Sequence, residues 1–162
     1  MSMDLHVVLV APEIPQNTGA IGRLCVCTGA RLHLIKPLGF KLDAAYVRRA
    51  GLDYWQHVPL TVHEDWEAFL AAARPPRLIF LSTKGPRCYL DCRFAPGDFL
   101  VFGNETSGLP PAFYARYADA LHTIPMPGPH PRSHNLANAV AIVVYEAYRQ
   151  LYYRPATAAA GA

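Results

Sequence analysis

Short runs of apolar residues, many of them β-branched or aromatic, recur along the chain between segments in which apolar and polar residues are mixed. Continuous runs of this kind are typical of strands that are buried on both faces of a parallel sheet. Because amphipathic segments separate the runs, the pattern predicts an α/β protein with a mostly parallel sheet flanked by helices. The expected strands are residues 5–10, 31–35, 58–62, 77–81, 98–102 and 120–124.

The most regular helical pattern lies near the C-terminal end of the sequence. Its apolar residues recur at the spacing of one helix face: Ala139, Val140, Val143, Val144, Ala147 and Leu151. Ser133 and Asn135 precede this stripe, and both residue types are favourable N-caps. We therefore expect a helix that begins close to these two residues.

A second helix is expected between the first two strands. Pro15 suits the first turn of a helix, and Gly29 suits the position just after its last turn. Gly19 and Gly22 lie within this segment although glycine is a poor helix former, so we expect another group to approach the helix closely. Shorter helices are expected at residues 41–50, 63–70 and 110–114.

Three polar loops, residues 82–86, 103–110 and 125–133, each follow an expected strand. The carboxyl ends of parallel strands share one edge of a sheet, so these loops are expected to form one ligand crevice. The prolines of residues 125–131 exclude a helix or a central strand there. Glu105 is the only carboxylate in the three loops, which favours ligand binding through backbone contacts over hydrolysis by paired carboxylates or a metal ion.

Composition narrows the class of protein. A chain of 162 residues with 52% hydrophobic and 17% charged residues is expected to fold as one domain rather than remain disordered. The net charge of +3 permits a polyanionic partner without requiring one. We find no apolar run long enough to cross a membrane and no signal-peptide pattern, so we expect a cytoplasmic protein without a membrane partner.

The cysteines and the missing motifs exclude several kinds of site. Cys25, Cys27, Cys88 and Cys92 have spacings that are unusual for zinc, so buried free thiols are expected, and no metal. The chain contains neither a P-loop motif nor the glycine-rich turn of dinucleotide-binding folds. It also lacks the G-x-S-x-G turn of α/β-hydrolases. A Rossmann-type methyltransferase is therefore disfavoured.

Three longer stretches carry a family resemblance. Residues 12–23 (PEIPQNTGAIGR), residues 102–110 (FGNETSGLP) and residues 124–150, with the run RSHNLANAVAIVVYEAYRQ, resemble in order the three motifs of the SPOUT RNA methyltransferases. His134 and Ala137 differ from the residues usual in that family, and the proline loop is one residue longer. Within the superfamily, the chain is most similar to the small bacterial enzymes that methylate the ribose 2′-oxygen of tRNA nucleotide 34.

The resemblance implies a SPOUT fold with a deep C-terminal trefoil knot, formed by a single domain of residues 1–154, with 155–162 as a disordered tail. It also implies S-adenosyl-L-methionine as cofactor, tRNA as substrate, and a homodimer packed through the first and last helices. The implied cofactor-binding residues are Leu81, Thr83, Gly103, Glu105, Ile124, Met126, Ser133 and Leu136. The implied catalytic residues are Arg23, Tyr145, Ser133 and Asn135, and the implied substrate-binding residues are Asn17, Arg23 and His134.

Simpler roles remain open for several of these residues. Asn17, Ser133 and Asn135 could each serve only as helix caps, and Glu105 could cap the helix expected near Pro110. Tyr145 could serve dimer packing alone. At the level of function, the alternatives are a SPOUT enzyme that acts on another tRNA or rRNA nucleotide, and a non-catalytic knotted RNA-binding protein.

Overall fold

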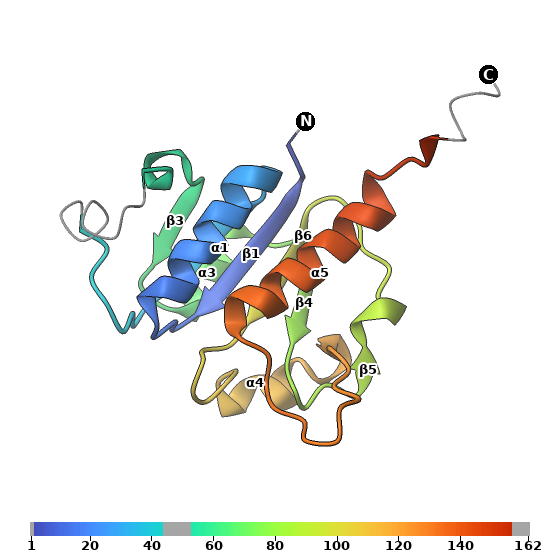
Figure 1. The fold of residues 1–162 in the computed structure, drawn as a ribbon. Coiled ribbons are helices and arrows are strands. Elements are labelled where there is room, and N and C mark those ends of the chain that lie inside the picture. Colours follow the sequence, from blue (N-terminus) through green and yellow to red (C-terminus); the bar gives the residue numbers. More distant parts are fainter. Residues whose placement is uncertain (1, 44–52, 157–162) are drawn as a thin grey trace.

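The computed structural model describes residues 2–43 and 53–156 and consists of a seven-stranded sheet covered on both faces by helices (Figure 1). The helix expected at residues 41–50 falls largely outside the described residues, and so does most of the tail expected from residue 155. Among the described residues, no helix is long and apolar enough to cross a membrane.

The sheet has the strand order β3-β2-β1-β6-β4-β7-β5, and every strand pair in it is parallel. The prediction of a mostly parallel sheet is therefore confirmed. The strand bounds are β1 Leu5–Val10, β2 Arg31–Ile35, β3 Leu60–His63, β4 Leu78–Leu81, β5 Arg87–Cys88, β6 Asp98–Phe102 and β7 Leu121–Thr123. The short strand β5 has no counterpart among the predicted strands.

Two apolar clusters pack on opposite faces of the sheet. On one face lie α1 (Pro15–Thr28) and α5 (Leu136–Leu151), which pack side by side (Figure 1). On the other face lie α3 (Trp66–Ala73) and α4 (Pro111–Arg116), with Trp66 and Phe113 in the core. Short 3₁₀ turns at Trp55–His57, Tyr89–Asp91 and Ala118–Ala120 complete the regular elements of the described residues.

The termini of α1 and α5 follow the sequence signals. Pro15 is the first residue of α1, and Gly29 ends it in the left-handed conformation with φ 78°. Asn135 caps α5, and its side-chain oxygen accepts hydrogen bonds from the N–H groups of Ala137 and Asn138. Val140, Val143, Val144 and Ala147 form the buried stripe of α5, as predicted.

Two aromatic residues, Tyr54 and Trp55, approach α1 closely at its glycines. A Cβ atom on Gly22 would lie 2.5 Å from the Trp55 ring, so a larger residue here would have to displace that ring. The Tyr54 hydroxyl donates a hydrogen bond to the carbonyl oxygen of Gly19, at 2.8 Å. The expected close approach to this helix is therefore confirmed, and the approaching groups belong to this chain.

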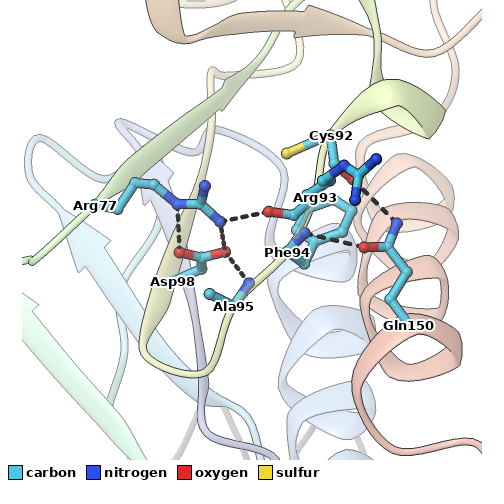
Figure 2. A network of polar contacts seen from close by, with 7 residues as sticks. All are labelled: Arg77, Cys92, Arg93, Phe94, Ala95, Asp98 and Gln150. Atoms are coloured by element: carbon cyan, nitrogen blue, oxygen red, sulfur yellow. Dashed lines mark hydrogen bonds and ion pairs between the residues drawn. The ribbon is translucent and has the colours of Figure 1, made fainter.

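An ion pair between the half-exposed Arg77 and the buried Asp98 ties the segment before β6 to its surroundings (Figure 2). The Arg77 guanidinium donates two hydrogen bonds to the Asp98 carboxylate, at 2.7 and 2.5 Å, and a third to the carbonyl oxygen of Arg93. From α5, Gln150 accepts a hydrogen bond from the Phe94 N–H and donates one to the carbonyl oxygen of Cys92 (Figure 2). Residues 92–98 are thus held between the start of β4 and the end of α5.

Three histidines form a hydrogen-bonded row across the sheet. His6 Nδ1 lies 2.9 Å from His33 Nε2, and His33 Nδ1 lies 3.0 Å from His63 Nε2. Phe99 stacks on His6, and Phe69 packs edge-on against His33 and His63. Burial, reinforced by the neighbouring histidines and Arg31, lowers the pKa of His33 to about 3, so this row is built from neutral rings.

Candidate functional site

A cavity of about 580 Å³ opens at the edge of the sheet where β4, β6 and β7 end. Its walls come from residues 81–84, 102–109, 123–124, 126 and 133–136, with Ile14 just before α1, Asn17 from α1, Tyr114 from α4 and Ala139 from α5. The three predicted loops therefore meet in one crevice. A ligand at this edge meets backbone groups from each loop, as at the carboxyl end of other open parallel sheets.

The loop after β6 is a compact turn that depends on its glycines. Asn104 Oδ1 accepts hydrogen bonds from the N–H groups of Thr106 and Ser107 and from the Ser107 hydroxyl. The backbone of Asn104 pairs with that of Gly108. A Cβ atom on Gly103 would lie 2.0 Å from the Gly108 backbone, so a larger residue would open the turn.

Glu105 binds the start of α1. Its carboxylate accepts hydrogen bonds from the N–H groups of Glu13 and Ile14, at 2.8 and 3.1 Å, and from the Asn17 side chain, at 3.2 Å. A negative charge at this position also complements the positive end of the helix. The alternative that Glu105 caps the helix near Pro110 is wrong, because α4 begins without a side-chain cap.

Asn17 links this carboxylate to the start of α5. Its side-chain oxygen accepts a hydrogen bond from Asn135 Nδ2 at 3.0 Å, while its own Nδ2 donates to Glu105. Asn17 is only 7% exposed, so the link is sheltered from water. Asn135, rather than Ser133, is the cap of α5, and Ser133 lies in the cavity wall two residues earlier.

All eight predicted cofactor-binding residues line the cavity, as do Asn17, His134 and Asn135 among the other predicted site residues. Arg23 and Tyr145 do not line it. Arg23 lies on the exposed side of α1, with its guanidinium carbon 5.9 Å from the centre of the Tyr54 ring. Tyr145 is 50% exposed on α5 and packs beside Tyr148.

Sequence reasoning missed one group of cavity residues. The Tyr114 hydroxyl and Ser82 Oγ lie 2.9 Å apart, and Lys84 Nζ lies 5.1 Å from the centre of the Tyr114 ring. Ser82 and Lys84 belong to a loop that was expected at the crevice. Tyr114 comes from an amphipathic helix, and no sequence signal places its hydroxyl at that loop.

The cysteines divide into two kinds. Cys25 and Cys92 are buried, and burial raises the pKa of the Cys25 thiol to about 12. Cys88 is partly buried and Cys27 is exposed, so the expectation of buried thiols is wrong for Cys27. Within residues 2–43 and 53–156, no cluster of His, Cys, Asp or Glu could hold a metal ion.

The sequence model of the SpoU rRNA methylase family matches residues 4–145. The chain belongs to this family. A relative from Burkholderia pseudomallei (strain 1106a), a tRNA (cytidine(34)-2′-O)-methyltransferase, is 54% identical over 148 residues, which are 90% of this chain and 94% of the relative.

Solved SpoU-like structures agree with this membership. One, described as giving structural insights into the 2-OH methylation of C/U34 on tRNA, has a TM-score of 0.84 and 49% identity and covers 93% of this chain and 97% of its own. AviRb from Streptomyces viridochromogenes is a SpoU methyltransferase in complex with the cofactor AdoMet. It has a TM-score of 0.73 and 29% identity, and the match covers 93% of this chain and 62% of AviRb.

Proposed function

We propose that this SpoU-family chain transfers a methyl group from S-adenosyl-L-methionine to the ribose 2′-oxygen of the wobble nucleotide, position 34, of tRNA. The observation that carries the proposal is the cavity, which gathers all eight expected cofactor positions at the carboxyl ends of three parallel strands. The relative from Burkholderia pseudomallei, named for this reaction, matches 90% of the chain.

The cavity suits the cofactor in size and in chemistry. A volume of about 580 Å³ falls in the range of small-molecule sites. Leu81, Ile124 and Leu136 offer apolar surface for a nucleoside, and Thr83 and Ser133 offer hydroxyl groups. The loop from Gly103 to Leu109 presents backbone groups to the cavity. Its turn is so tight that it has no room for a side chain at position 103.

The cofactor, when bound, supplies a methyl group that passes to the ribose oxygen, while its sulfur becomes a neutral thioether and the hydroxyl proton is released. A ribose hydroxyl is a weak acid, so the chain must stabilise the developing oxyanion. A guanidinium is a poor general base, so Arg23 is assigned to hold a substrate phosphate or this oxyanion. Polar groups in the wall of the cavity itself come from Ser133, His134 and Asn135.

The arginine assignment predicts the effect of a conservative change. Arg23→Lys keeps the charge but loses the fork of N–H donors, so kcat/KM is expected to fall by about tenfold or more. Binding of S-adenosylhomocysteine, measured by calorimetry, is expected to stay unchanged because Arg23 does not line the cavity. A lysine variant with near-full activity would contradict bidentate positioning by Arg23.

A homodimer packed through α1 and α5 would explain why Arg23 and Tyr145 lie away from the cavity. Both residues are on exposed faces of those helices. Tyr145 and Tyr148, which are 50% and 38% exposed, together leave aromatic surface on α5. We therefore assign Arg23 and Tyr145 to sites that a second copy of the chain completes.

We also propose that the C-terminal segment of this chain forms a deep trefoil knot. Helix α5 packs against α1 on one side, and its Gln150 bonds to the segment of Cys92 and Phe94 on the other. This arrangement suits a chain end threaded through the loop that carries residues 82–97. We further propose that residues 1–154 act as one domain in the cytoplasm, where the tRNA substrate is found.

The test is transfer of labelled methyl from S-adenosyl-L-methionine to bulk tRNA taken from cells that lack this protein. Label at nucleotide 34 is the expected result. Label at another ribose would support the second candidate function, methylation of a different RNA nucleotide. The name of the matching family, SpoU rRNA methylase, favours this candidate. Cofactor binding without label in tRNA would point to a different RNA substrate, and no cofactor binding at all would favour the non-catalytic RNA-binding alternative.

A further inference from the structure

One cationic side chain lies in the wall of the cavity and is used by none of the roles assigned above. Lys84 follows β4 and lines the cavity together with Ser82, Thr83 and Tyr114. Among the described residues it is the only lysine or arginine that does so. Its contacts with Ser82 and Tyr114 place its charge at the cavity.

The backbone that carries Lys84 is fixed by its neighbours. The Ser82 N–H donates to the carbonyl oxygen of His122, and the Gly85 N–H donates back to that of Ser82, closing a tight turn. The Lys84 N–H donates to Ser82 Oγ at 3.2 Å. A Cβ atom on Gly85 would lie 2.4 Å from the His122 carbonyl group, so the turn packs directly on β7.

The ammonium group lies over the ring of Tyr114. Lys84 Nζ lies 5.1 Å from the centre of the Tyr114 ring, an attractive contact between a cation and an aromatic face. The ring is itself anchored, because its hydroxyl is hydrogen-bonded to Ser82 Oγ at 2.9 Å. Lys84, although exposed, therefore lies against a residue of α4 that is remote in sequence.

The positive charge of Lys84 has no acidic partner in the cavity wall. None of the ion pairs of the described residues includes Lys84. Glu105 is the one carboxylate among the described residues that line the cavity, and it is bonded to the start of α1 and to Asn17. An ammonium group carries three N–H donors, so Lys84 is suited to bind an anionic group of a ligand in this cavity.

We propose that Lys84 binds the carboxylate of the cofactor's amino-acid part and that Tyr114 and Ser82 position it. This inference rests on the proposed function, in which the ligand of this cavity is a nucleoside that carries an amino acid. The carboxylate is the one anionic group of such a ligand. A lysine serves it well, because a charge-assisted hydrogen bond tolerates several directions of approach to an ammonium.

Calorimetric titration with two ligands tests the assignment on the intact chain. S-adenosylhomocysteine carries the amino-acid part, whereas 5′-methylthioadenosine has the same nucleoside without it. Lys84→Met keeps an unbranched side chain, one atom shorter, and removes its charge. It is expected to raise the Kd for S-adenosylhomocysteine about tenfold or more. The Kd for 5′-methylthioadenosine is expected to change less than twofold.

Lys36→Met is the matched control, because Lys36 pairs with Glu64 and does not line the cavity. It is expected to bind both ligands as the unchanged chain does. Tyr114→Phe keeps the ring under the ammonium but loses the bond to Ser82, so a smaller rise in the Kd for S-adenosylhomocysteine alone is expected. Thermal unfolding of each variant reports whether it is folded.

Three results would overturn the assignment. The first is an equal Kd for S-adenosylhomocysteine in Lys84→Met and in the unchanged chain. The second is an equal rise in Kd for both ligands. The third is weaker binding of tRNA alone, which would assign Lys84 to an RNA phosphate. Failure of the unchanged chain to bind S-adenosylhomocysteine would instead contradict the proposed function. The two failures are therefore distinguishable in the same set of titrations.

Discussion

At the scale of single residues, the site is organised by the hydrogen bonds that run from Asn135 through Asn17 to Glu105. The motifs of the sequence named all three residues, but they did not show that the three are bonded to one another. Residue types at fixed spacing do not specify which amide oxygen meets which N–H group. The pairing of Tyr114 with Ser82 was missed for the same reason, because it depends on how α4 packs.

Replacing Asn17 with Asp is expected to lower the free energy of unfolding by about 1–3 kcal/mol. The change removes the hydrogen bond that Asn17 donates to Glu105 and places a second carboxylate beside it, in a position that is 7% exposed. Urea unfolding followed by circular dichroism measures the effect.

Asn138→Asp is the control, because Asn138 is exposed in the first turn of α5, where a negative charge is tolerated. Its free energy of unfolding is expected to change by less than about 0.5 kcal/mol. Equal stabilities for the two variants would contradict the linking role of Asn17.

At the scale of elements, the apolar runs predicted six strands, and the structure places each of them within about two residues of the expected bounds. The missed strand, β5, consists of Arg87 and Cys88 and has no apolar run of its own. Its strand geometry comes from pairing with His122 and Thr123 of β7. A pairing between segments distant in sequence leaves no local signal, so sequence patterns could not reveal it.

The histidine row on the sheet predicts loss of stability in acid. Burial first, and then neighbouring charge, lowers the pKa of His33 to about 3, and burial also lowers the pKa of His6 and of His63. The unfolded chain takes up protons near the ordinary pKa of about 6.5, whereas the folded chain does not. Stability is therefore fully present above about pH 6.5 and falls as the pH is lowered toward 3.

For His33 alone, the free energy of unfolding is expected to fall by about 1.4 kcal/mol per pH unit below about pH 6. Urea unfolding at a series of pH values measures this slope. His33→Phe, which retains an aromatic ring beside Phe69 and Phe99, is expected to reduce it. The same slope in this variant would show that the row does not cause the acid sensitivity.

At the scale of the whole molecule, the sequence predicted that three loops would meet at one edge of the sheet, and the cavity confirms it. The order of the strands was not predictable, because apolar runs show that strands are buried without showing which strands are neighbours. The positions of Arg23 and Tyr145 outside the cavity were likewise not foreseen. Their separation from it is what a site completed by a second chain would produce.

Mixed dimers test this composite arrangement. Thr83→Trp is expected to fill the cavity, and Arg23→Ala removes the guanidinium, so each variant alone is expected to be inactive. In a heterodimer of the two, one cavity is intact and faces an intact Arg23 from the other chain. Co-expressed chains carrying different tags are therefore expected to recover part of the methyl transfer. No recovery in purified heterodimers would place Arg23 in the site of its own chain.

The most direct test of the central claim is the state of the ribose at nucleotide 34 in tRNA from cells that lack the gene for this chain. Mass spectrometry of nuclease fragments is expected to show that the 2′-O-methyl group is missing there. The group is expected to return when the purified chain and S-adenosyl-L-methionine are added to that tRNA. An unchanged methyl level at nucleotide 34 in these cells, with no transfer by the purified chain, would contradict the account.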